Sequence, residues 1–243
     1  MDQLSVLAAS GLRARMESLD LLANNIANAS TGGYKSDSEF YTLFASEAAA
    51  EDSPDTPATA PMIQRQWTDF SQGLLEPTNN PLDFGLSGKG FFVVQGPSGP
   101  LYTRNGSFHA ATDGTLVTTD GYPLLAKTGQ PLKADTKQPI EVALDGSIRQ
   151  NGQELGQLQV VDFPDPSVLA KQGNNYFLNT GAQAPEESTG VQVYQGRVEA
   201  SNVSAAQGAV RLVSVMRQFE MMQKAISISS DMSSKAITEV AKV

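Results

Sequence analysis

The sequence predicts an α+β protein: long N- and C-terminal helices pair as a coiled coil, and an all-β domain, an antiparallel sheet or small barrel, is inserted between them. Both chain ends show helical periodicity, the middle has short strand-like runs, and strands and helices do not alternate as in a doubly wound fold. The predicted parts are the N-terminal helix of the coiled-coil module (1–35), a linker or extended segment (36–75), the central β domain (76–195) and the C-terminal helix of the module (196–243).

The N-terminal helix is predicted from a narrow apolar stripe between residue 3 and about residue 29. Leu12, Leu19 and Ile26 are spaced by seven, and Leu22 falls at the matching second heptad position. This is the 3.5-residue period of a coiled-coil seam. The helix would be about 40 Å long at ~1.5 Å per residue. Because so thin a stripe buries little surface alone, we expect it to need a partner helix.

The middle of the chain changes character twice. The stretch AAAEDSPDTPATAP, small, acidic and proline-bearing, is typical of a loop or linker. From about residue 76, apolar runs such as GFFVV and LGQLQVVDF alternate with turn dipeptides and indicate about ten short strands. The strongest hairpin signals, which favour type I′ turns, are Asn105-Gly106, Asp113-Gly114, Asp120-Gly121, Asp145-Gly146 and Asn151-Gly152.

The C-terminal helix is predicted over about residues 202–242, a stretch without proline. Ser201 or Asn202 is expected to cap its start. Methionines fall on more than one face of this helix, which is typical of a helix enclosed by several neighbours. Gly208 costs about 1 kcal/mol against alanine in a helix interior. It therefore indicates close approach of another chain segment or a bend.

Composition excludes several classes of protein. The 243 residues carry 17 basic and 26 acidic side chains, a net charge of −9, so the basic patch of a nucleic-acid binder is not expected. There is no cysteine and one histidine, which argues against disulfides, thiolate metal sites and zinc. No cofactor is expected. We find no Sec-type signal and no apolar stretch long enough for membrane insertion, so we expect any export to leave the N-terminus intact.

Three features suggest a catalytic or ligand-binding site, and each is better explained as ordinary local structure. GLSGKGFF (85–92) lacks the glycine and hydroxyl positions of a phosphate loop and leads into a strand, so we interpret it as a tight turn before a buried strand. His109 is expected to be an exposed strand residue. Asp162 and Asp165 could form a glycosidase-like pair, but the prolines around them favour a turn. We therefore do not expect an enzyme.

The stretch ANNIANASTGGYK (23–35) places Asn24, Asn25 and Asn28 at the end of the predicted helix. Asparagine is unfavourable inside helices because its amide competes for backbone groups. Two explanations are equally good from the residues alone. Either the amides bond across an interface and fix its register, or the helix end is frayed and solvated, with Ser30 to Gly33 forming the C-cap and turn.

The same stretch closely resembles the N-terminal signature of the bacterial flagellar rod and hook axial proteins, roughly A-N-N-hydrophobic-A-N-x-x-T-x-G-aromatic-K. Gly32 stands where a proline is common. The resemblance continues through LSGKGFFVV (86–94), YTRNGSF (102–108), DGTLVTTDGYPLL (113–125) and VEASNV (198–203). In the C-terminal helix, Arg217, Glu220, Lys224 and Asp231 match family positions, whereas Gly208-Ala209 replaces the usual Glu-Leu.

The resemblance implies a non-catalytic structural subunit of the flagellar basal-body rod. Terminal helices would stack helically into an inner tube that transmits torque and encloses the export channel, and the β domain would form an outer layer. Implied partners are copies of the chain, other rod and hook axial proteins, and the flagellar type III export apparatus. The chain length and the short linker after Phe44 favour the proximal rod over the distal rod.

Alternatives to this interpretation are a distal rod subunit, a periplasmic protein that binds or cleaves peptidoglycan, and, less well supported, an adhesin-like surface fibre. The expected assembly interface consists of Leu12, Leu19, Leu22, Asn24, Asn25, Ile26, Asn28, Gly33, Leu212, Met216, Phe219 and Ile226.

Overall fold

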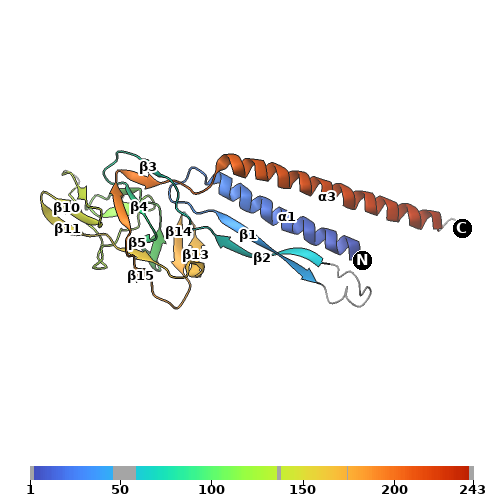
Figure 1. Ribbon diagram of the computed structural model, residues 1–243, viewed down its shortest axis with the longest axis horizontal. Helices are drawn as coiled ribbons and strands as arrows, with labels where there is room; N and C mark the ends of the chain where they lie inside the picture. Colours follow the sequence, from blue (N-terminus) through green and yellow to red (C-terminus); the bar gives the residue numbers. More distant parts are fainter. Residues whose placement is uncertain (1–2, 46–58, 136–137, 174, 241–243) are drawn as a thin grey trace. The chain divides into compact units, whose positions relative to one another are not determined.

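The computed structural model describes residues 3–45, 59–135, 138–173 and 175–240, which fall into two compact units. The helix unit contains both long helices and one β-hairpin. The β unit contains residues 28–36 and 69–203. The chain therefore enters the β unit briefly after its first helix, returns to the helix unit for the hairpin, and then forms the rest of the β unit before the last helix (Figure 1).

The helix unit consists of α1 (Gln3–Ala27), α3 (Ala205–Val240), β1 (Asp37–Ala45) and β2 (Thr59–Thr68). The two helices lie side by side (Figure 1). Gly208, near the start of α3, faces Ile26 near the end of α1, and Met222 faces Gly11, so the helices are antiparallel. A Cβ atom at Gly208 would lie 2.9 Å from Ile26 Cγ1, which explains a glycine in a helix interior. The pairing of the terminal helices is thus seen, and their coiled-coil geometry stays a prediction.

Strands β1 and β2 occupy the region interpreted as a linker or extended segment. They pair antiparallel from Asp37 opposite Thr68 to Ala45 opposite Thr59, with an irregularity after Phe40. Most of the acidic, proline-bearing stretch lies outside the described residues. Glu39 on β1 accepts a hydrogen bond from Ser18 of α1 at 2.8 Å and one from Arg211 of α3 at 3.0 Å. This carboxylate therefore ties the hairpin to both helices.

The β unit is antiparallel, as predicted, and its described residues form several small sheets rather than a closed barrel. The largest sheet has the strand order β13-β14-β6-β5-β12-β15. Between residues 75 and 195 the described residues form fourteen strands, β3 to β16, where about ten were expected. The elements of the unit are β3 (Leu75–Pro77), β4 (Phe84–Ser87), β5 (Phe91–Gly96), β6 (Gly99–Thr103), β7 (Phe108–Ala110), β8 (Leu116–Thr118), β9 (Glu141–Val142), β10 (Ser147–Gln150), β11 (Gln153–Gln157), β12 (Val160–Asp162), the 3-10 helix η1 (Pro166–Val168), β13 (Leu169–Gln172), β14 (Tyr176–Asn179), β15 (Glu186–Glu187), β16 (Gln192–Gln195) and β17 (Arg197–Glu199).

Two hydrophobic cores lie on opposite faces of the largest sheet. Along β5, Phe92 and Val94 belong to one core, and Phe91 and Val93 belong to the other. Side chains alternate between the faces of a strand, so a strand covered on both faces has a continuous apolar run rather than an alternating one. The run GFFVV is therefore explained by burial on both sides, and GLSGKGFF is a turn into a buried strand, as expected.

The turn dipeptides are only partly as expected. Asn151-Gly152 has positive φ at both residues, 51° and 76°, and joins β10 to β11 as predicted for a type I′ turn. At the three Asp-Gly pairs only the glycine has positive φ. Gly106 has no positive φ; a Cβ there would lie 1.6 Å from the Phe84 carbonyl oxygen, so this glycine permits close packing rather than a turn.

The start of α3 corrects a second expectation. The helix begins at Ala205, and Ser204 caps it: its carbonyl accepts from Gly208 N at 2.8 Å and its hydroxyl weakly from Gln207 N at 3.4 Å. Ser201 and Asn202 therefore lie before the cap, and the Asn202 amide has other partners. Neither helix, in the part of the chain described, is long and apolar enough to cross a membrane.

Candidate assembly surface

Asn25 fixes the start of the hairpin. Its side-chain nitrogen donates to the Asp37 carbonyl at 2.7 Å, and its oxygen accepts from the Asp37 backbone N–H at 3.0 Å. The Asn25 amide thus makes the same pair of hydrogen bonds to the backbone of Asp37, the first residue of β1, that a neighbouring β-strand would make. Asn25 is only 7% exposed. The structure therefore adds a third explanation to the two given for this asparagine, because its partner is the backbone of its own chain.

The other two asparagines have different surroundings. Asn28 lies in the β unit, where its side-chain oxygen accepts from Thr31 Oγ1 at 3.2 Å and its carbonyl accepts from Thr31 N at 3.1 Å. These bonds close the turn after α1. Asn24 is exposed on the helix surface. Three neighbouring residues of one type therefore serve a hairpin contact, a turn and an exposed helix face.

Gly33 holds the end of the signature against the β unit. Its φ is +70°, a left-handed conformation that side chains disfavour. A Cβ atom there would lie 2.3 Å from the backbone nitrogen of Asn105. The Gly33 N–H donates to the Glu199 carbonyl at 2.6 Å. Both backbone conformation and space require glycine at this position.

A buried ionic cluster, which we call the anchor cluster, consists of Lys35, Arg104 and Glu199. Lys35 Nζ lies 2.5 Å from Glu199 Oε1, and Arg104 Nη1 lies 3.3 Å from Glu199 Oε2. The side chains of Lys35 and Glu199 are fully buried, and that of Arg104 is 4% exposed. Lys35 also donates to the Ser71 carbonyl at 2.6 Å, and Glu199 accepts from Gly73 N at 2.8 Å.

Burial dominates the electrostatics of the anchor cluster. Loss of solvation lowers the pKa of Lys35, and the neighbouring Glu199 carboxylate opposes that change. Loss of solvation lowers the pKa of Arg104 in the same way. The Glu199 carboxylate thus faces two cations, Lys35 and Arg104. Two buried cations are tolerated here because this carboxylate compensates their charge.

Asn202 connects the three points at which the chain enters or leaves the β unit. Its side-chain oxygen accepts from Ser36 N, and its nitrogen donates to the Asp69 carbonyl, both at 2.8 Å. Asp69 N also donates to the Ser36 carbonyl at 2.8 Å. The chain leaves the β unit after Ser36, re-enters at Asp69 and leaves again after Val203. One asparagine therefore holds these points together.

Four sequence motifs meet at the anchor cluster, although they are far apart in the chain. Lys35 ends the first signature, Arg104 lies in YTRNGSF, and Glu199 and Asn202 lie in VEASNV. Arg104 also donates to the carbonyl of Gly88 in LSGKGFFVV at 2.6 Å. The cluster is closed to solvent, and its hydrogen bonds to Ser71, Gly73 and Gly88 order the backbone around it. The motifs are visible in the sequence but their meeting place is not, because the residues around Lys35 and Glu199 give no sign that both side chains are buried.

The predicted interface residues are distributed over both units. Gly33 and Asn28 lie in the β unit, and the others lie in the helix unit. Leu22, Asn25 and Gly33 are buried, and Asn24 and Met216 are exposed. The partly buried members are Leu12, Leu19, Ile26, Asn28, Leu212, Phe219 and Ile226. Their role in assembly stays a prediction.

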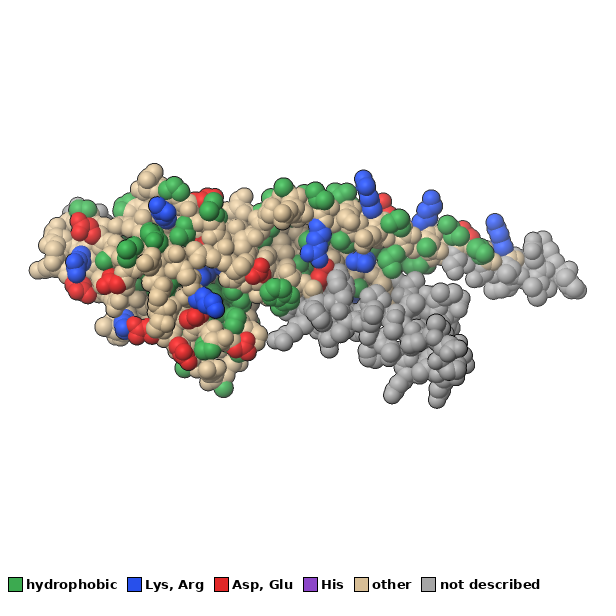
Figure 2. Space-filling model, in the orientation of Figure 1, with side chains coloured by type: hydrophobic (Ala, Val, Ile, Leu, Met, Phe, Trp, Pro, Cys, Tyr) green, Lys and Arg blue, Asp and Glu red, His purple; other side chains and the backbone are tan. Residues whose placement is uncertain are grey.

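α3 has apolar side chains on two faces. One face, with Val215 6% exposed, is covered within the helix unit. On the opposite face, Val210 is 74% exposed, Met221 64% and Ile228 51%. Figure 2 shows hydrophobic and basic side chains interspersed along this helix. A shallow hollow of about 590 Å³ lies among Val210, Val213, Arg217 and Met221. Such uncovered apolar surface is typical of an interaction site.

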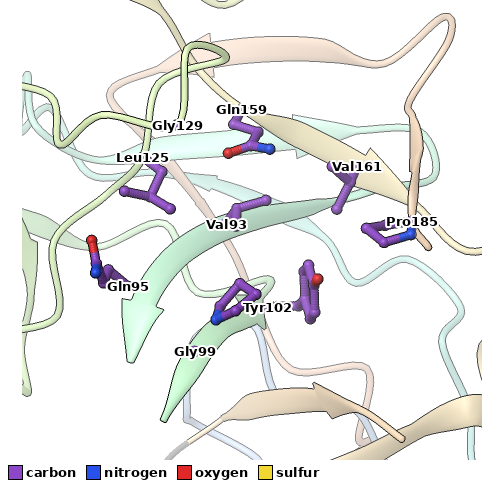
Figure 3. Close-up of a pocket in the computed structure, with 10 residues that line it drawn as sticks. Val93, Gln95, Gly99, Tyr102, Leu125, Gly129, Gln159, Val161 and Pro185 are labelled. Atoms are coloured by element: carbon purple, nitrogen blue, oxygen red, sulfur yellow. The ribbon is translucent and has the colours of Figure 1, made fainter. Parts of the chain in front are cut away.

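A groove of about 480 Å³ lies on the β unit (Figure 3). Val93, Tyr102, Leu125 and Val161 line it with two glutamine amides, Gln95 and Gln159, and no carboxylate is among its lining residues. The carboxylates considered for catalysis have local partners instead: Asp165 caps η1 through Ser167 N at 2.9 Å, and Asp162 accepts from Phe163 N at 2.8 Å. His109 is an exposed residue of β7, as predicted.

These features define a class of protein: a chain with an ordered β unit and a helix pair whose apolar surface is incompletely covered. Three segments match known families. Residues 7–35 match the flagella basal body rod protein family, 85–153 the flagellar hook protein FlgE/F/G D1 domain, and 194–239 the flagellar basal body rod FlgEFG protein C-terminal family.

Similar proteins cover nearly the whole chain. The flagellar basal-body rod protein FlgF of Caulobacter vibrioides is 32% identical over 226 residues, 93% of this chain and 92% of the relative. FlgG of Buchnera aphidicola (subspecies Acyrthosiphon pisum) is 34% identical over 255 residues, 93% of this chain and 95% of the relative. FlgG of Caulobacter vibrioides is 31% identical over 249 residues, with 93% and 94% covered. The chain belongs to the flagellar basal-body rod protein family.

Proposed function

We infer that this chain is a structural subunit of the bacterial flagellar basal-body rod, which assembles helically through its terminal helices with copies of itself and other axial proteins. The observation that carries this inference is the match to rod proteins over more than nine tenths of the chain. The uncovered apolar face of α3 supports assembly through the helices, because that surface loses water contact only when another chain covers it.

We further propose a place in the proximal rod. The match to FlgF of Caulobacter vibrioides spans 226 positions, about the number of residues of this chain that it covers, so it needs few insertions. The matches to FlgG span 249 to 259 positions, more than the 243 residues of the chain, and therefore require insertions in the relatives. The alternative is a distal rod subunit. The proposed route to the rod is the flagellar type III export apparatus, without cleavage of a signal peptide.

Substitution of Leu19 by aspartate tests assembly through the helices. Leu19 is a partly buried residue of α1, and a carboxylate there would have to be buried in any helix bundle that uses this seam. We expect Leu19→Asp to be lost from basal bodies isolated from cells in which the variant replaces the native chain, with the β unit still folded. Leu144→Asp is the matched control, because Leu144 is 53% exposed on the β unit. Normal incorporation of Leu19→Asp would show that this seam assignment is wrong.

A further inference from the structure

α1 carries a second, exposed seam, which we call the outer α1 seam. Its members are spaced alternately by four and three residues, which is the heptad pattern of a coiled coil. They lie on the side of the helix away from Ser18 and Asn25, whose side chains bond to β1. All are exposed: Ala9, Arg13, Met16, Asp20, Ala23 and Ala27. The seam thus combines small residues, one large apolar residue and two opposite charges.

α3 carries a matching exposed seam, the outer α3 seam. Its members also follow alternating spacings of four and three, on the side of the helix away from Val215 and Phe219. They are exposed: Val210, Ser214, Arg217, Met221, Lys224, Ile228, Asp231 and Lys235. Within the described residues, no ion pair involves Arg217 or Lys224. The outer α3 seam therefore combines three apolar residues with three cations, one serine and the carboxylate of Asp231.

The charges of the two outer seams are complementary in an antiparallel register. Arg13 and Asp20 are seven residues apart, and so are Asp231 and Lys224. When Arg13 faces Asp231, Asp20 faces Lys224. Arg13 already bonds Glu17 at 3.1 Å, but both side chains are exposed, so this pair is weak and leaves Arg13 accessible.

The apolar residues fit in the same register. Met16 then faces Ile228, between the two charge pairs, and the small Ala23 faces the large Met221. In a parallel pairing of the same heptad positions, Arg13 and Asp20 would meet Ser214, Met221, Ile228 or Lys235, so at most one pair of opposite charges would form, whereas the antiparallel register forms two. Two outer α3 seams in parallel would place Lys224 against Lys224. Charge complementarity therefore selects an α1 seam as the partner of an α3 seam.

We propose that the outer α1 seam of one copy packs antiparallel against the outer α3 seam of a second copy. This proposal rests on the proposed function, since it names the contact by which copies join. The contact is heterologous, because the two copies use different surfaces. The first copy keeps its outer α3 seam available, and the second keeps its outer α1 seam. Such contacts build open assemblies rather than closed dimers. The apolar pairs supply affinity and the charges supply orientation and register.

Disulfide trapping tests the register, because the chain has no cysteine of its own. Full-length Ala23→Cys and Met221→Cys chains, distinguishable by tag size, are mixed and oxidised. We expect the mixed disulfide to form in clear excess over either homodimer. The matched control is Gln223→Cys, which is also exposed on α3 but lies outside the outer seam; it should give little mixed disulfide with Ala23→Cys.

Charge exchange tests the pairing independently. Adding Asp20→Lys to the Ala23→Cys chain should weaken formation of the mixed disulfide at least ~10-fold, because Lys would face Lys224. Adding Lys224→Asp to the Met221→Cys chain should restore it. If full-length copies associate but the mixed disulfide does not form, or the exchange does not restore it, the pairing is wrong and the rod function stands. If copies do not associate at any concentration and the chain is missing from basal bodies, both the pairing and the rod function are wrong.

Discussion

The β unit and the helix unit differ in how completely they bury their own apolar surface. In the β unit, Phe84, Phe92 and Leu124 are fully buried, and even the charged Lys35 and Glu199 are enclosed. In the helix unit, Val210 and Met221 on α3 are mostly exposed. Full burial of each such side chain would contribute about 1.5–3 kcal/mol. The β unit therefore has the core of an independent domain, whereas the helix unit lacks part of its core.

The β unit should lose the most stability when a residue of its anchor cluster is substituted. Glu199→Gln leaves Lys35 and Arg104 as two buried cations without a compensating carboxylate. We expect the free energy of unfolding of the β unit to fall by about 3–5 kcal/mol, measured by chemical denaturation of the full chain with a β-unit probe. Glu187→Gln removes a carboxylate from an exposed pair with Lys127 and should have little effect. Equal losses in the two variants would contradict the role of burial.

In the helix unit, substitution of Asn25 should weaken the structure locally, at the start of β1. Asn25→Ala removes both hydrogen bonds to the Asp37 backbone and leaves its N–H without that partner. We expect local opening of β1 to become easier by about 1–3 kcal/mol, seen as faster amide hydrogen exchange at Asp37 and its neighbours. Asn24→Ala, on the exposed face of the same helix, should change this exchange much less. If the two variants behave alike, the paired contact with β1 is not what positions Asn25.

A smaller, pH-dependent effect is expected at the Asp113 turn of the β unit. Hydrogen bonds from Thr115 and the nearby Lys133 lower the pKa of Asp113 to about 2. Because this pKa is lower in the folded state, the carboxylate stabilises the fold above its unfolded pKa, and the contribution is lost as the pH falls from about 4 to about 2. Asp113→Ala should therefore have a lower denaturation midpoint than the wild type near neutral pH and the same midpoint near pH ~2. A difference that persists unchanged in acid would exclude this explanation.

The sequence predicts the elements of both units better than their contacts. Heptad spacing located α1, a long stretch without proline located α3, and the run GFFVV located a buried strand, because the pattern of apolar residues reflects which faces of an element are covered. The capping residue of α3 was predicted three or two positions too early, at Ser201 or Asn202, since serine and asparagine both cap helices and Asn202 is used instead to join Ser36 and Asp69.

The anchor cluster could not be predicted from the residues alone. Lys35 and Glu199 are 164 positions apart, and nothing in their neighbourhoods indicates that both are buried. Only the folded β unit brings the motifs together. For the outer seams, the sequence shows the spacing of the residues. It does not show which apolar face of the helix is covered within the chain and which is exposed; that requires the structure.

The central claim is that the helix unit becomes complete only when copies assemble, and amide hydrogen exchange of the full chain tests it most directly. In dilute solution we expect strong protection in β5, β6 and β14 and much weaker protection in α1 and α3, because isolated amphipathic helices are marginal in water. In assembled rods both helices should become as protected as the sheet. Protection of α1 and α3 in the dilute single chain at the level of β5 would contradict the claim.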